Sequence, residues 1–375
     1  MTISDGADPD ADISRFVPKR NLTRQIQREW ARFLQRKTGA SLEGWTSLAL
    51  ANSGLADHLN DMPRHVVNLH WINSDFISIG EIGRIVHPVV WTLHDMWPFC
   101  GAEHYSEADA WKSGYAEQNG GFDLNRWVWR RKRKHWKRKF HIVVPSRWMG
   151  NCVSDSDLMG DWPVHVIPNA IDSDLWAPMD RAEARVLLKL PPDVPLVLFG
   201  AMGGSSDPRK GFEHLRAALL QLHAEGHDLR LLIFGGDANE GELPFPVHSM
   251  GAVSDPAMLR AMYAAADVFA LPSRQDNLPN TGVEALSCGT PIVGFKTGGL
   301  PDLVPSPDIG YLAKPFDPGD LARGIAKVLG RQSSDAGAQR SLMSEAARNH
   351  AVATYAQQVV AKKYGALYHE ILQDA

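Results

Sequence analysis

The chain has 375 residues, of which 44% are hydrophobic and 22% are charged. This length predicts two domains of roughly 150 residues each, and the apolar content excludes an intrinsically disordered protein. The mean hydropathy is negative and no uncharged apolar run approaches the roughly 18 residues needed to cross a bilayer, so no membrane-spanning helix is expected.

The termini and cysteines indicate a cytoplasmic protein. Residues 1–20 are predicted to be a disordered acidic tail, since residues 1–13 contain four Asp and no apolar stretch, which excludes a secretory signal peptide. Cys100, Cys152 and Cys288 have neither CxxC nor zinc-ligand spacing. They predict a reducing compartment without a disulfide framework or structural metal.

The first helix is expected over residues 21–37, where Leu22, Ile26, Trp30 and Phe33 recur at helical spacing and predict a surface helix docked on the first sheet. Short apolar runs then alternate with amphipathic helical patterns such as Phe212–Glu225 and Pro256–Ala266. This alternation predicts two doubly wound parallel α/β sheets, with a boundary near Pro168–Pro178 and ligands at the carboxyl ends of the strands. The predicted strands are Val66–Trp71, Pro88–Leu93, His141–Pro145, His165–Pro168, Leu196–Gly200, Leu229–Gly235, Val268–Pro272 and Pro291–Phe295.

The net charge of −4 hides a strongly basic segment. Residues 126–139 contain nine Lys and Arg and no acid, which leaves 30 basic against 43 acidic side chains elsewhere, a net charge of −13. Trp127, Trp129, Trp136 and Phe140 interleave with these cations. The segment 126–140 is therefore interpreted as a solvated helix with its aromatic residues in the core, or as a surface that docks on an anionic membrane. Nucleic-acid binding is disfavoured because the rest of the chain repels phosphates.

His94 and Asp95 follow the predicted strand Pro88–Leu93, where a parallel sheet presents side chains to a ligand. A lone histidine is more often structural than catalytic, and His70 and His104 are rivals with no better spacing. Asp95 is expected to position an imidazole or the local backbone.

A Gly-rich loop follows the strand Leu196–Gly200 in the segment FGAMGGSSDPRKGFEHL, residues 199–215. Its spacing is not that of a Walker motif. Arg209 and Lys210 at the end of this loop are candidates for pairing with a diphosphate, although adjacent surface cations are often only solvated.

The most informative stretch is residues 271–304, where a strand ends at Pro272 and a helix is expected to begin near Thr281. Backbone N–H groups of Asn280, Thr281 and Gly282 would form an anion site at the helix N-terminus. Asp276 and Glu284, eight residues apart, would accept hydrogen bonds from sugar and ribose hydroxyls. The spacing leaves an alternative open, in which Asp276 and Asn277 only cap the helix.

The motifs QDNLPNT, EALSCGTPIV and GGLPD in this stretch resemble retaining GT-B glycosyltransferases of the family-4 kind, and are especially similar to bacterial colanic-acid and exopolysaccharide enzymes. The segments WTLHDMWPF and VIPNAID fall in the same order as in that family. The resemblance implies an α/β GT-B fold with two Rossmann-like doubly wound domains facing a cleft. It places Asp276 beside the donor sugar, Glu284 on the ribose, Lys210 on the phosphates and His94 beside donor sugar and acceptor.

The resemblance also implies a domain organisation. The tail 1–20 precedes an acceptor-side domain at 21–170, a nucleotide-sugar domain at 171–354 and a C-terminal helix at 355–375 that crosses back to the first domain.

Two features of the sequence depart from the pattern of this family. The usual opening strand and Gly-rich loop are missing, with GASLEG at 39–44 a poor substitute, and Ala201–Met202 stand where relatives have Arg. Either the start is misplaced or the first domain is truncated.

The activity implied is transfer of a hexose from a UDP- or GDP-sugar to a saccharide or lipid-linked acceptor, with retention of configuration. Exopolysaccharide or lipopolysaccharide assembly is the expected pathway, with no metal, no cofactor besides the donor and no nucleic-acid partner. The alternatives are another nucleotide-sugar enzyme of similar architecture, such as an epimerase or phosphorylase, and a non-catalytic membrane-associated relative.

Overall fold

The computed structural model describes residues 46–63, 65–73, 76–106, 108–116, 121–200, 207–236, 243–330 and 336–374, together with Phe16, 25–27, 29–30 and 33. The predicted acidic tail, apart from Phe16, lies outside these residues, as do the loop 39–44 and Ala201–Met202. Of the predicted helix 21–37, residues 25–27, 29–30 and 33 are described, and they are helical.

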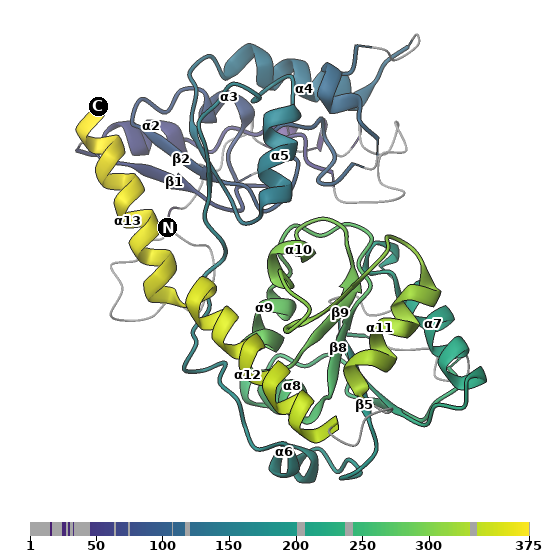
Figure 1. Ribbon diagram of the computed structural model, residues 1–375. Coiled ribbons are helices and arrows are strands. Elements are labelled where there is room, and N and C mark those ends of the chain that lie inside the picture. Colours follow the sequence, from purple (N-terminus) through teal and green to yellow (C-terminus); the bar gives the residue numbers. More distant parts are fainter. Residues whose placement is uncertain are drawn as a thin grey trace. The chain divides into compact units, whose positions relative to one another are not determined.

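The chain divides into two compact units, drawn in Figure 1. The first comprises Met1–Pro145, Met149–Val166 and Ala366–Ala375. The second comprises Ser146–Trp148 and Ile167–Gly365. Helix α13 (Gln357–Asp374) therefore contributes residues to both units.

The first unit contains a parallel sheet whose strands each fall within a predicted strand or one residue from it. Their order is β1-β2-β3-β4, with Val67 opposite Val89 and Ile142 opposite Val164. Since this is also the chain order, the reversal that defines double winding is not found among the strands described in this unit. The strands are β1 (Val67–Leu69), β2 (Val89–Thr92), β3 (His141–Val144) and β4 (Val164–Val166), and the helical elements are α2 (Leu55–Asn60), α3 (Ile79–Ile82), η1 (Ala110–Ser113), α4 (Leu124–His135) and α5 (Arg147–Asp155).

The second unit contains a doubly wound parallel sheet of order β10-β9-β8-β5-β6-β7. The winding reverses between the adjacent strands β5 and β8. Two strands were not predicted: β7 is three residues long and partly exposed, and β10 has a mixed burial pattern. The strands are β5 (Leu196–Gly200), β6 (Arg230–Phe234), β7 (Val247–Ser249), β8 (Val268–Leu271), β9 (Ile292–Phe295) and β10 (Gly310–Ala313).

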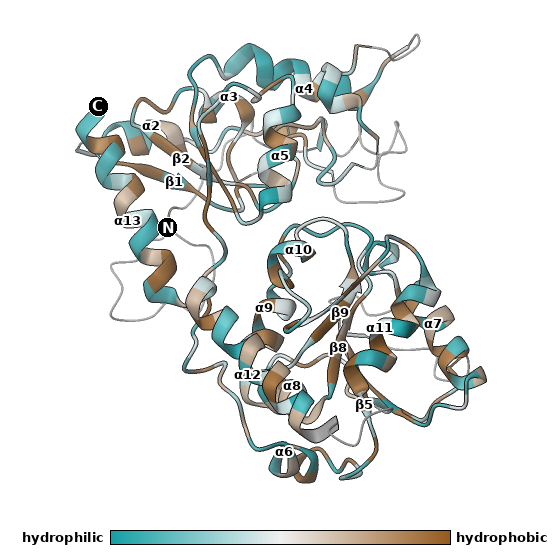
Figure 2. Cartoon of the chain, viewed as in Figure 1, coloured by the Kyte–Doolittle hydropathy of each residue, from teal (hydrophilic) through white to brown (hydrophobic). Residues whose placement is uncertain are grey.

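Helices cover both faces of the second sheet, which buries two separate apolar clusters. Figure 2 shows the hydrophobic colouring concentrated on β8 and β9 between these helices. Such two-sided burial explains why the sequence of these strands is continuously apolar. The helical elements are α6 (Arg181–Leu187), η3 (Pro208–Lys210), α7 (Phe212–Ala224), α8 (Pro256–Ala265), α9 (Asn280–Ser287), α10 (Leu300–Leu303), α11 (Pro318–Leu329) and α12 (Ala336–Tyr355). Of the helices described, none has the length and apolar character to span a bilayer.

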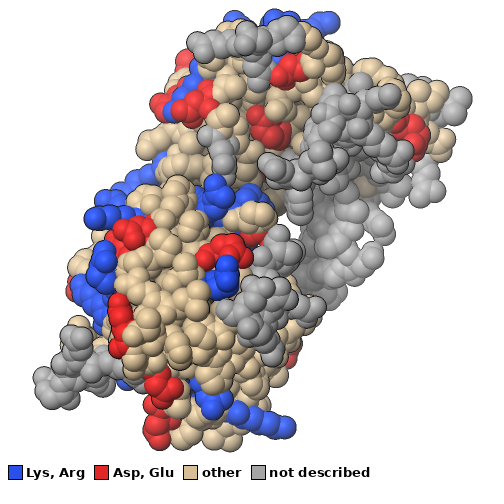
Figure 3. Space-filling model, turned by 90° about the vertical axis from the view of Figure 1, so that its right-hand side faces the viewer, with Lys and Arg blue, Asp and Glu red and all other residues tan. Residues whose placement is uncertain are grey.

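The basic segment 126–140 packs its aromatic residues inward. Trp129, Trp136 and Phe140 are buried at 3%, 5% and 2% exposure, as the first interpretation of this segment predicts. They do not share one helical face, because α4 ends at His135, before Trp136. On the face drawn in Figure 3, Lys and Arg are interspersed with Asp and Glu, and no single sign of charge covers the part of that face that the structure describes.

One of the nine cations in this segment is an internal residue. Lys132 is fully buried, and its Nζ donates to the carbonyl oxygens of Trp97, Cys100 and Gly101, the last two at 3.0 and 2.7 Å. The same Nζ lies 3.8 Å from the centroid of the Trp97 ring. Burial lowers the Lys132 pKa to about 7. Lys132 is therefore not one of the solvated cations that both interpretations of this segment assume, because three carbonyls of the turn after β2 take the place of water around its Nζ.

The three cysteines are all buried with free thiols. Burial raises the thiol pKa of each, to about 11 for Cys152 and about 12 for Cys288. Cys100 and Cys152 belong to the first unit and Cys288 to the second.

Replacing Lys132 should destabilise the first unit. We expect Lys132→Met to lower its free energy of unfolding by about 3 kcal/mol or more, because buried carbonyls left without a donor cost about 1–3 kcal/mol each. Urea unfolding followed by tryptophan fluorescence measures this change. Lys134→Met, at an exposed position of the same helix, is the matched control and should stay within about 0.5 kcal/mol of wild type. Equal midpoints for the two variants would contradict the internal role of Lys132.

Candidate active site

The candidate site lies where the winding of the second sheet reverses. Strands β5 and β8 are direct neighbours, with Val197 opposite Val268. Because parallel strands end at the same edge, the segments that follow β5 and β8 lie side by side, although more than sixty residues separate them. These segments carry Lys210 and Asp276, the predicted phosphate-binding and sugar-binding residues.

Lys210 and Asp276 form an ion pair at this edge. The distance from Lys210 Nζ to Asp276 Oδ2 is 2.7 Å, and the two side chains are 24% and 13% exposed. The backbone holds them together, since Arg274 N donates to Arg209 O at 2.7 Å. Gly211 permits this approach: its φ is +70°, and a Cβ there would lie 2.0 Å from Pro272 O. The structure therefore brings together two residues that were predicted from separate motifs.

Arg209 does not join this pair. Its guanidinium contacts Asp207, with 2.8 Å between Nη2 and Oδ2. Asp207 also caps the short helix η3 by accepting a hydrogen bond from Arg209 N. The sequence treats Arg209 and Lys210 as equivalent phosphate ligands, whereas the structure pairs Arg209 with a neighbouring carboxylate and Lys210 with Asp276.

Asp276 and Asn277 do not cap helix α9, so the alternative reading of this loop was wrong. The N-cap position belongs to Pro279, which offers no side-chain hydrogen bond. The Asp276 carbonyl instead accepts from Gly299 N at 2.9 Å, and the Asn277 Oδ1 accepts from Ser146 Oγ at 2.6 Å. The Asp276 carboxylate is thus directed to Lys210 rather than to the helix.

The N-terminus of α9 offers fewer backbone donors than predicted. Gly282 N donates to Pro279 O at 3.0 Å, so it is not the free donor that the sequence suggests. The first helical residues, Asn280 and Thr281, have no carbonyl within the helix to receive their N–H groups. Gly282 instead allows Leu303 to pack closely against α9, since a Cβ at residue 282 would lie 2.7 Å from Leu303 Cδ1.

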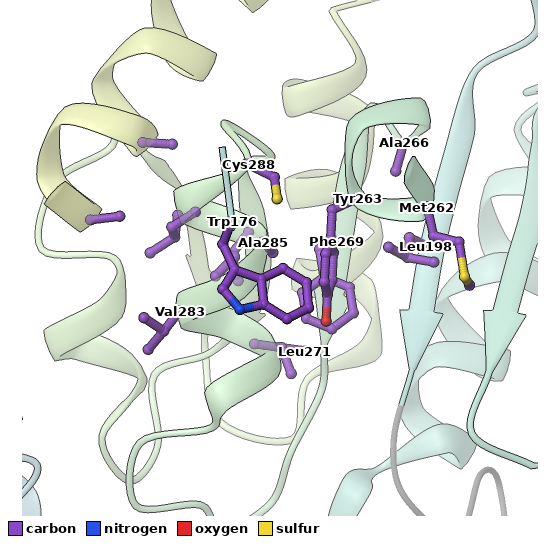
Figure 4. Close-up of a cluster of buried hydrophobic side chains, with 14 of the residues drawn as sticks. Trp176, Leu198, Met262, Tyr263, Ala266, Phe269, Leu271, Val283, Ala285 and Cys288 are labelled. Atoms are coloured by element: carbon purple, nitrogen blue, oxygen red, sulfur yellow. The ribbon is translucent and has the colours of Figure 1, made fainter. Parts of the chain in front are cut away.

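Glu284 is held by a tyrosine that the sequence interpretation did not identify. The hydroxyl of Tyr263, on α8, donates to Glu284 Oε2 at 2.8 Å. Burial raises the Glu284 pKa, and the bond from Tyr263 opposes that shift. Tyr263 packs against Trp176 and Phe269, with ring centroids 6.0 and 5.6 Å apart, and Figure 4 shows these three rings together. The only feature of the sequence that could have indicated a role for Tyr263 is its position on a helix that precedes a buried strand.

His94 lies in the first unit, directly after β2, on the wall of a small pocket. Its Nε2 is 3.1 Å from Nδ1 of His70, one of its rivals in the sequence. Burial, with a smaller contribution from His70, lowers the His94 pKa to about 4. The imidazole is therefore neutral at physiological pH and acts as a hydrogen-bonding group rather than a cation.

Asp95 orients a different histidine. Its Oδ2 lies 2.6 Å from His104 Nδ1, and its Oδ1 accepts from Trp97 N at 3.0 Å. The Nε2 of His104 is in turn 2.8 Å from Ser47 Oγ. Asp95 thus fixes the turn after β2 through His104 and the backbone, and this buried network was not apparent from the spacing.

Residues 195–331 match the family described as glycosyl transferases group 1. This segment carries Arg209, Lys210, Asp276 and Glu284. Residues 195–331 form a glycosyl transferases group 1 domain.

Curated relatives of this chain are glycosyltransferases by name. The D-inositol 3-phosphate glycosyltransferase of Segniliparus rotundus is 32% identical over 178 residues, which are 44% of this chain and 39% of that protein. The MMP alpha-(1->4)-mannosyltransferase of Mycolicibacterium hassiacum is 30% identical over 244 residues, 61% of this chain and 55% of that protein. The chain thus spans less than two thirds of the length of these relatives.

Solved structures show that the chain has the α/β GT-B fold. Sucrose-phosphate synthase from Thermosynechococcus elongatus superposes with a TM-score of 0.62 at 21% identity, covering 86% of this chain and 77% of that one. Anabaena Alr3699/HepE in complex with UDP gives 0.60 at 18% identity, covering 86% and 81%. The α/β fold class predicted from the sequence is confirmed.

Tyr263→Phe should make the stability of the group 1 domain more sensitive to pH. Removing the hydroxyl raises the Glu284 pKa further, and a carboxyl with a raised folded-state pKa loses stability as pH rises through that pKa. The loss of unfolding free energy relative to wild type should therefore be larger at about pH 8 than at about pH 5.

Tyr311→Phe is the matched control for this measurement. The Tyr311 hydroxyl donates to Asp320 Oδ1 at 2.7 Å and helps to lower the Asp320 pKa. Removing this hydroxyl should therefore change the pH dependence of the unfolding free energy only below about pH 4. Urea unfolding of Tyr311→Phe should give the same loss of unfolding free energy at about pH 5 as at about pH 8. A pH-independent loss for Tyr263→Phe would contradict the contact with ionised Glu284.

Proposed function

We propose that the chain is a GT-B glycosyltransferase that moves a hexose from a nucleotide-diphosphate sugar to an acceptor hydroxyl. The observation that carries this proposal is the Lys210–Asp276 ion pair at the switch point of the group 1 domain, 2.7 Å between charged atoms. A cation and a carboxylate side by side match the two halves of such a donor, since the cation suits the diphosphate and the carboxylate suits sugar hydroxyls.

Each residue has a separate part in this mechanism. As the bond from the anomeric carbon to the diphosphate oxygen breaks, Lys210 and the N–H groups of Asn280 and Thr281 stabilise the negative charge on the leaving group. Asp276 accepts hydrogen bonds from the sugar, and Glu284, already oriented by Tyr263, accepts from the ribose. A new bond forms to the acceptor oxygen on the same face of the sugar, and the acceptor proton leaves with the diphosphate.

The finer assignments belong to this proposal as well. Retention of configuration, a UDP- or GDP-sugar donor, a saccharide or lipid-linked acceptor and a place in exopolysaccharide or lipopolysaccharide assembly are supported by the motifs around Asp276. A structural neighbour, Anabaena Alr3699/HepE, has been solved with UDP and with UDP-glucose, which favours a uridine donor. We propose that His94 takes part in sugar binding as a neutral imidazole, and that no cofactor or metal is needed.

Turnover with a panel of UDP- and GDP-sugars, with and without EDTA, tests the mechanism. We expect Lys210→Met and Asp276→Asn each to lower kcat/KM by about 100-fold or more, because each removes a contact to the charge-developing centre. Lys362→Ala, an exposed lysine of α13 in the same unit, is the matched control and should leave kcat/KM unchanged.

Two results would contradict this proposal. An absence of both transfer and donor hydrolysis with every donor would favour a non-catalytic relative. Full activity in Lys210→Met would show that another group carries the diphosphate. Loss of activity in EDTA would contradict only the metal-free part of the mechanism.

We also propose that the basic segment 126–140 brings the first unit to an anionic membrane, where a lipid-linked acceptor would be available. Since Trp129, Trp136 and Phe140 are buried, docking rests on exposed cations of α4 such as Arg130 and Lys134. Lys132 does not take part, because its ammonium is bound inside the unit.

Vesicle flotation measures this docking. Each surface cation contributes about 1 kcal/mol, so Arg130→Gln combined with Lys134→Gln should lower partitioning to phosphatidylserine vesicles about 30-fold. Lys362→Ala again serves as the control. Equal recovery with neutral and anionic vesicles would contradict membrane docking without affecting the proposed transfer reaction.

A further inference from the structure

The pocket beside His94 has an exposed aromatic wall that the proposed mechanism does not use. Trp71 follows β1 and is 57% exposed, an unusual degree of solvent contact for an indole. Its ring lies nearly parallel to the His94 imidazole, with 8° between planes and 5.4 Å between centroids. Because β1 and β2 are adjacent parallel strands, the residues that follow them share the ligand-binding edge of the first sheet.

The backbone at Trp71 adopts a conformation that a bulky residue rarely takes. Its φ is +44°, in the left-handed region that favours glycine or asparagine. Apart from its stacking on His94, this large aromatic residue remains more than half exposed, so packing offers little to offset the backbone strain. Strain of this kind is concentrated at functional sites.

A second residue of this pocket offers a polar contact. Asn73 lines the pocket with Trp71 and His94, and its Oδ1 is buried with no hydrogen-bond partner among the residues that the structure describes. A buried acceptor without a donor costs free energy that a ligand hydroxyl would recover. Among the described residues that line the pocket there is no Lys or Arg, so this part of its wall is not built for a phosphate group.

We propose that Trp71 and Asn73 form a specificity-determining subsite for a neutral pyranose of the acceptor. The apolar face of the sugar stacks on the exposed indole, and a ring hydroxyl donates to Asn73 Oδ1. The absence of lining cations separates this subsite from the donor-binding residues, whose central member is Lys210. The proposal deepens the proposed transferase function and rests on it for the identity of the sugar as acceptor.

Saturation-transfer NMR with methyl α-D-glucopyranoside and methyl α-D-mannopyranoside tests the subsite directly on the full chain. We expect wild type to transfer saturation to the ring protons of at least one glycoside. Trp71→Ala and Asn73→Ala should each lower its affinity by about threefold to tenfold. Phe122→Ala is the matched control, since Phe122 is a similarly exposed aromatic residue of the same unit at 59% exposure. This control should retain wild-type affinity.

Trp71→Gly separates a binding role from a structural one. Glycine adopts a positive φ without strain, so this variant should have a thermal midpoint no lower than that of Trp71→Ala while losing the sugar in the same way. Transferase assays should then show a raised acceptor KM with an unchanged affinity for UDP, measured by calorimetry.

The possible results test the subsite and the transferase proposal separately. No saturation transfer to either glycoside in wild type, or equal affinity in wild type and Trp71→Ala, would overturn the subsite even if the enzyme is active. Sugar binding that depends on Trp71, in a protein that transfers no sugar from any donor, would uphold the subsite and overturn the transferase proposal.

Discussion

The reversal of winding between β5 and β8 is the constraint on which the candidate site depends. Adjacent parallel strands must end at the same edge, so the segments that follow them meet whatever their separation in the chain. The Lys210–Asp276 contact follows directly from this topology. Helix α9 begins four residues after Asp276, which places its N-terminus at the same edge. A cation, a carboxylate and a set of backbone donors are therefore assembled by the sheet itself.

The first unit organises the turn that follows β2 with an internal cation. The ammonium of Lys132 gathers three carbonyls of the turn after β2, and Asp95 holds the same turn through His104 and the backbone of Trp97. Irregular backbone cannot satisfy its own carbonyls as a strand or helix does, so a buried donor is required. The turn that follows His94 is thereby fixed without regular secondary structure.

Much of the fold was predictable because buried parallel strands carry an apolar signal in every residue. The same logic explains the two missed strands, since β7 and β10 are partly exposed and shorter in apolar sequence. For the candidate site, strand ends and loop motifs pointed to Lys210, Asp276, Glu284 and His94, of which the structure brings Lys210 and Asp276 into direct contact. Side-chain partners were not predictable: the pairing of Arg209 with Asp207 and the contact from Tyr263 to Glu284 depend on rotamers and on packing between helices. Lys132 was misassigned because a run of cations contains no signal that one of them points inward.

The three buried thiols give the two units separate chemical reporters. A thiol reacts as its thiolate, and burial both raises the thiol pKa and excludes the reagent. Modification of Cys100 or Cys152 therefore requires opening of the first unit, and modification of Cys288 requires opening of the second. Rates of thiol labelling in the native protein would thus resolve the local stabilities of two halves that a single unfolding curve averages.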